Sequence, residues 1–160
     1  MSDRKSLNIR RARLDEADLL TELSMRSKQS NGYDDAFMNA CREELTVTEE
    51  RMTGGEYWVA DSEEICGCVC LGTNDIAHSG EVHAFFIEPK WQRKGIGKLL
   101  WQKLLERARS KGLKQLHLDA DPAAVPFYEM LGFETIFEVP SGSIPGRTIP
   151  RMRMLIENEH

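Results

Sequence analysis

The sequence predicts a single α/β (α+β) domain built from seven strands and about four helices. Runs of alternating apolar and polar residues, which are typical of strands, occur between runs with apolar residues at helical spacing. Their order is one strand, two helices, three strands, one helix, one strand, one helix and two strands. No repeat, linker or low-complexity tract interrupts the chain, so we expect residues 1–160 to form one domain.

The first half of the chain is predicted to hold three strands and two helices. Phe37, Met38 and Cys41 have helical spacing, and Gly54–Gly55 marks a break before the next strand. The expected elements are a strand over Leu7–Ala12, a helix from about Asp15 to the break at Ser30–Gly32, a helix over Asp34–Leu45, and a hairpin of Glu56–Asp61 and Ile65–Leu71.

The second half is predicted to hold four strands and two helices. The start of its short helix stays open between the cap pair Asp121–Pro122 and Pro126, because Pro126 would break a regular turn. The expected elements are a strand over Glu81–Ile87, a helix over Ile96–Lys111 that ends at Gly112, a strand over Gln115–Ala120, a short helix holding Phe127–Leu131, and a closing hairpin of Phe133–Val139 and Thr148–Ile156.

The composition argues for a cytoplasmic protein that binds neither nucleic acid nor a membrane. Hydrophobic residues make up 41%, charged residues 29%, and the formal net charge is −5. A negative chain is poorly suited to the phosphate backbone of nucleic acid. Met1–Lys5 begins no apolar signal segment, and no apolar run approaches the roughly 20 residues that cross a membrane.

The four cysteines indicate small core residues in a reduced compartment. Cys66, Cys68 and Cys70 follow a C-x-C-x-C spacing, which differs from the C-x-x-C of zinc sites. On a strand this spacing places all three on one face. We therefore expect no metal site.

A glycine-bearing loop between a strand and a helix predicts a site for phosphate. Free amides at a helix start and the positive end of the helix dipole attract anions, and glycine lets the backbone approach them closely. The P-loop pattern is absent, and the dinucleotide pattern fails because its third glycine position is Leu100. The loop is Gln92-Arg93-Lys94-Gly95-Ile96-Gly97, followed by Lys98.

Two motifs in this chain resemble those of the GNAT superfamily of acyl-CoA-dependent N-acyltransferases. The Q-x-x-G-x-G pattern at Gln92–Gly97 resembles the pyrophosphate loop of that family. Downstream, Asp121–Phe133 resembles the family segment N-x-x-A-x-x-F-Y-x-x-x-G-F, with Asp121 in place of the usual asparagine. The resemblance is strong over 82–133 and weaker toward both ends.

The resemblance implies a fold and a cofactor. The fold is a mixed, mostly antiparallel seven-stranded sheet that splays between its fourth and fifth strands. Acetyl-CoA would lie in the gap as co-substrate, without a metal, and its pantetheine amides would pair with the open edge of the fourth strand. The residues implied in cofactor binding are Phe85, Phe86, Ile87, Gln92, Arg93, Lys94, Gly95, Ile96, Gly97, Lys98, Asp121 and Phe127.

Three residues are candidates for the chemistry of acetyl transfer to an amine. Glu81 and His83 lie two apart on one strand face, and each matches a base position in one branch of the family. Ordered water is a third candidate for the proton-accepting role, and the choice stays open. Tyr128 matches the family tyrosine that faces the sulfur, and a phenol with a pKa of about 10 can protonate the departing thiolate.

The acceptor is predicted to be a primary amine of a small molecule or peptide. Family resemblance places its site near Tyr33 and Asp34, between the first two helices, and near Ser143 and Arg147 in the closing loop. Asp34 is equally suited to cap a helix. A non-catalytic acyl-CoA-binding module, and a transferase that uses another acyl group or acceptor, are the alternatives. The identity of the acceptor and the oligomeric state stay open, since the closing hairpin could pair with a second copy in a homodimer.

Overall fold

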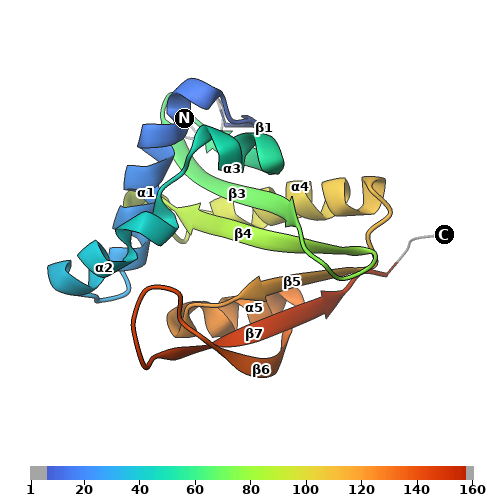
Figure 1. Ribbon diagram of the computed structural model, residues 1–160. Coiled ribbons are helices and arrows are strands. Elements are labelled where there is room, and N and C mark those ends of the chain that lie inside the picture. The colour runs from blue at the N-terminus through green and yellow to red at the C-terminus, as the bar shows by residue number, and fades with distance from the viewer. Residues whose placement is uncertain (1–6, 158–160) are drawn as a thin grey trace.

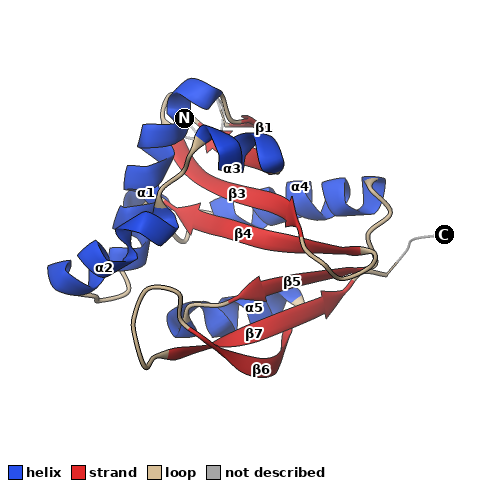
Figure 2. Ribbon diagram, viewed as in Figure 1, coloured by secondary structure: helices blue, strands red, loops and turns tan. Residues whose placement is uncertain are grey.

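The computed structural model describes residues 7–157, which contain one mixed sheet of seven strands (Figures 1 and 2). Its order is β1-β2-β3-β4-β5-β7-β6; β4 and β5 are parallel, and the other neighbours are antiparallel. This confirms the predicted fold class, whereas Met1–Lys5 lies outside the described residues. The strands are β1 (Asn8–Arg11), β2 (Glu56–Asp61), β3 (Ile65–Thr73), β4 (Ser79–Ile87), β5 (Gln115–Asp119), β6 (Glu134–Pro140) and β7 (Thr148–Leu155).

The helices follow the prediction with one addition. The unpredicted helix is α3, whose first turn is capped by the Thr48 hydroxyl, which accepts from the Arg51 amide at 3.2 Å. It has only 6 residues, too few for an apolar period to appear in the sequence. The helices are α1 (Ala17–Gln29), α2 (Asp35–Leu45), α3 (Glu49–Gly54), α4 (Ile96–Ser110) and α5 (Val125–Leu131), with 3-10 turns at Leu14–Glu16, Pro89–Trp91 and Pro122–Ala124.

The start of α5 combines both cues that the sequence offered. The Asp121 carboxylate accepts from the Ala123 amide at 2.9 Å and caps the 3-10 turn Pro122–Ala124. The α-helix then begins at Val125, which places Pro126 in its first turn, where a missing amide costs no hydrogen bond.

The sheet divides between β4 and β5. These two strands pair only where Ser79–Glu81 faces Gln115–His117. Beyond Glu81, β4 continues to Ile87 beside β3, while β5 continues beside β7. The diverging strands produce the wedge visible in Figure 1 between the β3–β4 half and the β5–β7 half. The predicted splay is therefore confirmed.

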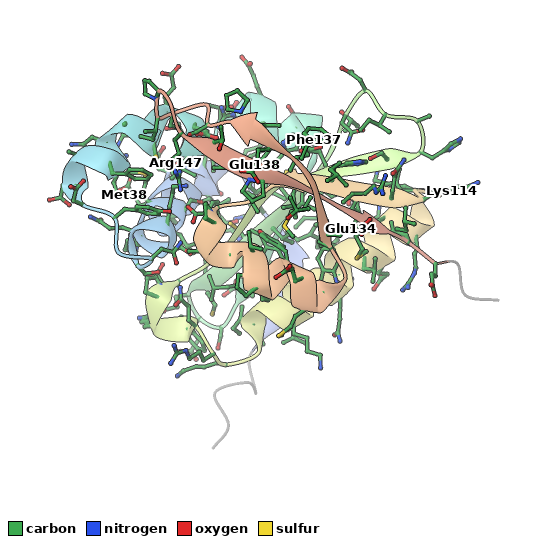
Figure 3. All side chains as sticks on the ribbon, turned by 90° about the horizontal axis from the view of Figure 1, so that it is seen from below. Met38, Lys114, Glu134, Phe137, Glu138 and Arg147 are labelled. Carbon is green, nitrogen blue, oxygen red and sulfur yellow. The ribbon has the colours of Figure 1, made fainter. Side chains whose placement is uncertain are left out.

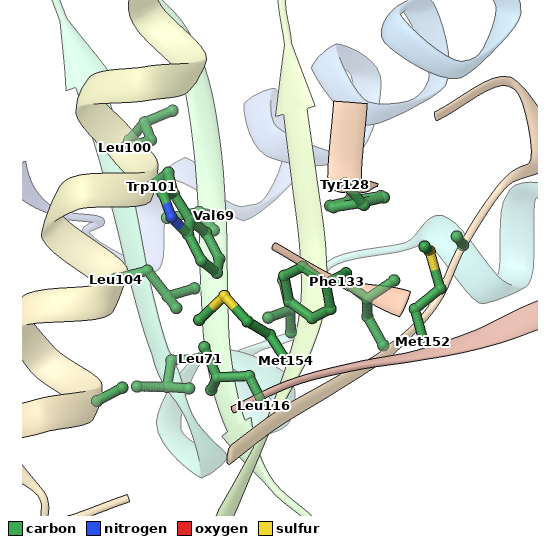
Figure 4. Close-up of a cluster of buried hydrophobic side chains, with 14 of the residues drawn as sticks. Val69, Leu71, Leu100, Trp101, Leu104, Leu116, Tyr128, Phe133, Met152 and Met154 are labelled. Carbon is green, nitrogen blue, oxygen red and sulfur yellow. The ribbon is translucent and has the colours of Figure 1, made fainter. Parts of the chain in front are cut away.

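Two apolar clusters hold the helices on opposite faces of the sheet. The larger one packs the predicted face of α4, with Leu100 and Leu104 fully buried, against β2, β3 and β4, and it also includes residues of β5 and β7. Figure 4 shows its centre, where Trp101 lies against Phe133 with ring centroids 5.6 Å apart. The smaller cluster packs α1 and α3 against β2 and β3. Burial of these apolar side chains holds α4 on one face of the sheet and α1 and α3 on the other.

The prediction that the three strand cysteines share a face is wrong. Cys68 and Cys70 pack in the smaller cluster, but Cys66 packs in the larger one. The cause is a bulge, because Ala60 faces Gly67 while Asp61 faces Ile65. The intervening Cys66 has no partner on β2, and the alternation of faces shifts by one residue. All four cysteines are reduced and buried.

Residues 7–157 contain neither a candidate membrane-spanning helix nor a candidate metal cluster. None of the helices there combines the length and apolar character that crossing a bilayer requires. Within the same residues, histidine, cysteine and acidic side chains do not gather into a group of three or more suited to a metal ion.

Candidate active site

The loop before α4 has the backbone geometry that the glycines predicted. Gly95 precedes the helix with φ +83°, and Arg93 also lies in the left-handed region at φ +64°. The Gln92 amide group donates to the Ile87 carbonyl at 3.4 Å and ties the loop back to β4. The free amides at the start of α4 and the cationic side chains around them make this end of the helix suitable for a diphosphate.

A cleft of about 860 Å³ lies between the two halves of the sheet and reaches this loop. Lys94 alone among the predicted cofactor residues is not part of its wall, and its ammonium instead lies 5.4 Å from the centre of the Trp91 ring. The predicted cofactor residues on the wall are Phe85, Phe86, Ile87, Gln92, Arg93, Gly95, Ile96, Gly97, Lys98, Asp121 and Phe127.

A bulge on β4 determines which side chains lie at the point where β4 and β5 separate, which we call the fork. Cys70 faces Ala84 and Leu71 faces Val82, so His83 has no partner on β3. Val82 packs in the larger cluster and Ala84 in the smaller one, on the opposite face of the sheet. The bulge therefore projects His83 out of the regular ladder at the place where β4 leaves β5.

His83 is the candidate base that both cavities reach. A second cavity, of about 500 Å³, lies beside the first, and His83 lines both. The imidazole is exposed and lies over Gly72 of β3, where an added Cβ would come within 2.2 Å of the ring. Gly72 is thus the residue that gives the imidazole room to lie across the strand.

Glu81 also lines the smaller cavity, as the shared strand face predicted, but its carboxylate is already bound. Arg151 of β7 donates to both carboxylate oxygens, at 2.6 and 3.0 Å. The Asn74 amide adds a third hydrogen bond at 3.0 Å. No local pattern indicated these partners, because Arg151 lies 70 positions further along the chain.

Tyr128 occupies the wall of the larger cavity opposite β4. It is 9% exposed, and its ring packs edge-on against Phe127 and Phe133. Burial raises the pKa of its phenol well above the ordinary value. No other described residue hydrogen-bonds to the hydroxyl, so a neutral O–H donor faces the cavity.

Asp121 joins three segments that the sequence did not connect. Its carboxylate pairs with Lys28 of α1 at 3.0 Å and accepts from the Tyr33 hydroxyl at 2.9 Å. Arg147 of the β6–β7 loop donates to the same Tyr33 oxygen at 2.9 Å. Burial alone would raise the pKa of Asp121, but the hydrogen bond from the Ala123 amide and the Lys28 charge hold it below its ordinary value.

The other predicted acceptor residues have different positions. Arg147 also covers Phe37 of α2, 5.0 Å from the ring centre, and Figure 3 shows it beside this helix near Met38. Ser143 donates to Glu44 of α2. Asp34 is exposed and accepts from the Phe37 amide at 2.8 Å, so it caps α2, the alternative that the sequence left open. The β6–β7 loop is thereby bridged to α2 across the wedge.

Comparison with known proteins agrees with this geometry. The family model described as an acetyltransferase (GNAT) domain matches residues 22–155. The chain belongs to the GNAT superfamily. A peptidyl-lysine N-acetyltransferase of Salmonella typhimurium is 33% identical over 132 residues, which are 80% of this chain and 83% of that protein.

Other GNAT relatives match over shorter segments or in fold alone. A glucosamine 6-phosphate N-acetyltransferase of Trypanosoma brucei brucei is 39% identical over 34% of this chain and 37% of its own length. This chain spans half or less of the first three curated relatives that it matches. An N-acetyltransferase of Thermoplasma acidophilum, solved with coenzyme A, shares the fold with a TM-score of 0.73 and 19% identity, over 94% of this chain and 99% of that one.

Proposed function

We propose that this GNAT protein transfers the acetyl group of acetyl-CoA directly to a primary amine of a small molecule or peptide. The observation that carries the proposal is the meeting of two cavities at the β4 bulge. The larger reaches the phosphate-binding loop of α4, the smaller has an acidic wall, and His83 lines both. A thioester in one and an amine in the other would be neighbours at this point.

The acidic wall of the smaller cavity suits a cationic acceptor. Glu44, Glu81 and Asp119 line it, whereas its one cationic lining residue, Arg51, is bound to backbone carbonyls of Glu44 and Thr46. An ammonium would be attracted into this cavity and must then lose a proton before it can attack. His83 is the lining group with an accessible nitrogen, which favours it over the occupied carboxylate of Glu81 as the proton acceptor.

The reaction then needs a donor for the leaving group. The amine nitrogen forms a bond to the thioester carbonyl carbon, the carbon–sulfur bond breaks, and the electron pair leaves on sulfur. The nitrogen then loses its second proton as the amide forms, and this proton replaces, through solvent, the one that Tyr128 gives to the thiolate. Tyr128 supplies a proton to that thiolate, and its buried phenol stays protonated at neutral pH because burial raises its pKa. A backbone amide of β4 near Phe86 or Ile87, which both line the larger cavity, would bind the oxyanion.

Direct attack is favoured over an acetyl intermediate on one of the three strand cysteines. Burial raises the pKa of the Cys66 thiol to about 11 and that of Cys68 and of Cys70 to about 12. A thiol that remains protonated is a poor nucleophile. The strand cysteines therefore belong to the core of the protein rather than to its chemistry.

The test is release of coenzyme A thiol from acetyl-CoA in the presence of a panel of primary amines. The panel should include diamines, aromatic amines, amino sugars and lysine-containing peptides. We expect thiol release that depends on one class of amine and is matched by acetylated product. Tight binding of acetyl-CoA with no turnover on any acceptor would instead support a non-catalytic binding module.

A further inference from the structure

We propose that Arg151 is a positioning residue whose guanidinium clasps Glu81 at the fork of the sheet and so fixes the spacing of the two walls of the cleft. The inference rests on the proposed function only for the identity of the ligand. Its structural content is a link between β7 and β4 at the point where the sheet divides.

Because of the position of Glu81 in the sheet, its contact with Arg151 can control the separation of β4 and β5. Glu81 is the last residue of β4 that pairs with β5, and its partner there is His117. One wall of the cleft continues from Glu81 along β4, and the other continues from His117 along β5. The hydrogen bonds between Arg151 and Glu81 lie at the apex of the wedge. A small change in the angle between β4 and β5 at this point therefore produces a larger displacement at the open ends of the two strands.

Arg151 reaches that apex from the far side of β5. It lies on β7, where it pairs with Asp119 of β5, and its guanidinium crosses β5 to Glu81. The same group donates to the Asp119 carboxylate at 3.1 Å. One side chain thus connects three strands that belong to both halves of the sheet, and its two N–H groups fit the carboxylate of Glu81 in a bidentate arrangement.

Burial makes this pair strong and its rupture costly. The side chains of Arg151 and Glu81 are 15% and 11% exposed, so solvent screens the two charges little. The groups around them complete the network. Asn74 joins Glu81 to the Ser79 hydroxyl, and Ser79 in turn contacts His117 Nδ1 at 2.7 Å. Burial lowers the pKa of His117, which keeps this imidazole neutral and leaves Arg151 as the partner of Glu81.

Loss of the guanidinium would leave two carboxylates without their shared cation. Glu81 and Asp119 both line the smaller cavity, and their charges would then repel across the fork. Water entering to solvate them would separate β4 from β5 beyond their last paired residues. The cleft would then widen and no longer fit the cofactor, even though every side chain proposed to contact the cofactor was still present.

The test compares Arg151→Met with Arg153→Met. Arg153 lies on the same strand beside His117, but its guanidinium pairs with Glu134 of β6 and not with Glu81, so it is a matched cation outside the clasp. Binding of acetyl-CoA is measured by calorimetry, at a temperature where thermal unfolding shows every variant to be folded. We expect Arg151→Met to weaken binding about tenfold, a change typical of residues coupled in one ion-pair network, and Arg153→Met to leave it unchanged.

Two further variants separate positioning from stability and from proton transfer. Arg151→Lys restores one hydrogen bond and should recover part of the affinity. Glu81→Gln should weaken binding like Arg151→Met, and the double variant should be no weaker than either single one, because both remove the same contact. Unchanged affinity in Arg151→Met, with only a lower unfolding temperature, would overturn the proposal.

A loss of kcat in Glu81→Gln without a loss of affinity would also overturn it, since that pattern belongs to a group acting in proton transfer. The binding measurements need no acceptor, and only the kcat comparison requires the amine. Failure of the clasp therefore appears as unchanged binding, whereas failure of the proposed function appears as parent protein that binds acetyl-CoA and transfers nothing.

Discussion

The two sides of the cleft are built in different ways. On the cofactor side, the loop Arg93–Gly95 and the first turn of α4 present backbone amides, and the residues that shape them are adjacent in sequence. On the opposite side of the same cleft, the wall consists of side chains from α1, the segment before α2 and the β6–β7 loop, joined through Asp121, Tyr33 and Arg147.

This difference indicates where the chain tolerates change. A backbone site keeps its ligand when surface side chains vary, but it depends on glycine and on the helix start. A side-chain network has no such backbone constraint, and each substitution in it alters the shape of the cleft on that side. We therefore expect side-chain substitutions to have the largest effect in this network, and glycine substitutions to have the largest effect at the loop before α4.

The largest effect is expected at His83, where the two sides meet. His83→Ala removes the accessible imidazole and should lower kcat/KM for the amine by roughly 10²–10⁴-fold. His78→Asn is the control, since His78 is exposed at φ +56° on a turn and asparagine tolerates that conformation. Steady-state rates across pH would show the loss. An unchanged rate of amine acetylation in His83→Ala would assign the acceptance of the amine proton to Glu81 or to water.

Tyr128→Phe should lower kcat by about 10²-fold, the contribution expected of a general acid. The ring and its packing remain, so affinity for acetyl-CoA should hold. The defect should shrink with an acyl donor whose thiol is more acidic, because that thiolate needs less help to leave. A rise in the KM for acetyl-CoA with kcat unchanged would instead assign the hydroxyl to cofactor binding.

Gly95→Asp tests the backbone side. The side chain is strained at φ +83°, and its charge opposes a diphosphate, so affinity for acetyl-CoA should fall by about 10–100-fold, the range of a hydrogen bond to a charged group. Gly112→Asp is the control, because Gly112 ends the same helix at φ +73° with no neighbour within 4 Å of an added Cβ. Equal affinities by calorimetry would place the phosphates elsewhere.

Asp121→Asn tests on which side this residue acts. It keeps the shape but removes the charge that pairs with Lys28, so we expect the free energy of unfolding to fall by about 1–2 kcal/mol. Affinity for acetyl-CoA should change little. A marked gain or loss of that affinity would show that position 121 contacts the cofactor, as the family motif implies.

The smallest expected effect is the loss of stability that protonation of Asp121 causes at acidic pH. The pKa of Asp121 in the folded protein is held below its ordinary value of 3.8, so its contribution to stability is complete above that value. It should disappear as the pH falls through the folded pKa. Urea unfolding of the parent and of Asp121→Asn, followed downward from pH 5, should converge. A constant difference between the two would contradict the ionised pair.

Local patterns in the sequence predicted most of the fold and the backbone geometry of the loop before α4. The glycine loop and the apolar face of α4 are each encoded by residues that lie close together in the sequence, so both could be located without a structure. The helix α3 was missed because one and a half turns carry no periodic signal. The bulge at Cys66 was missed because nothing in the local pattern marks the extra residue.

The sequence did not predict how the side chains across the cleft are connected. Tyr33 and Arg147 were proposed for the acceptor and Asp121 for the cofactor, and the structure joins the three. Their hydrogen bonds join positions 88 and 114 apart in sequence, and only the tertiary fold brings them together. Glu81 illustrates the same limit, since the partner that occupies its carboxylate lies on β7.

Direct transfer is the central claim, and the mass of the intact protein tests it most directly. The parent protein is incubated with acetyl-CoA, first alone and then with the amine that supports thiol release. The account predicts an unmodified protein in both samples, and in the second one acetylated amine for each coenzyme A released. An acetyl group on the protein, formed without amine and lost when amine is added, would contradict it.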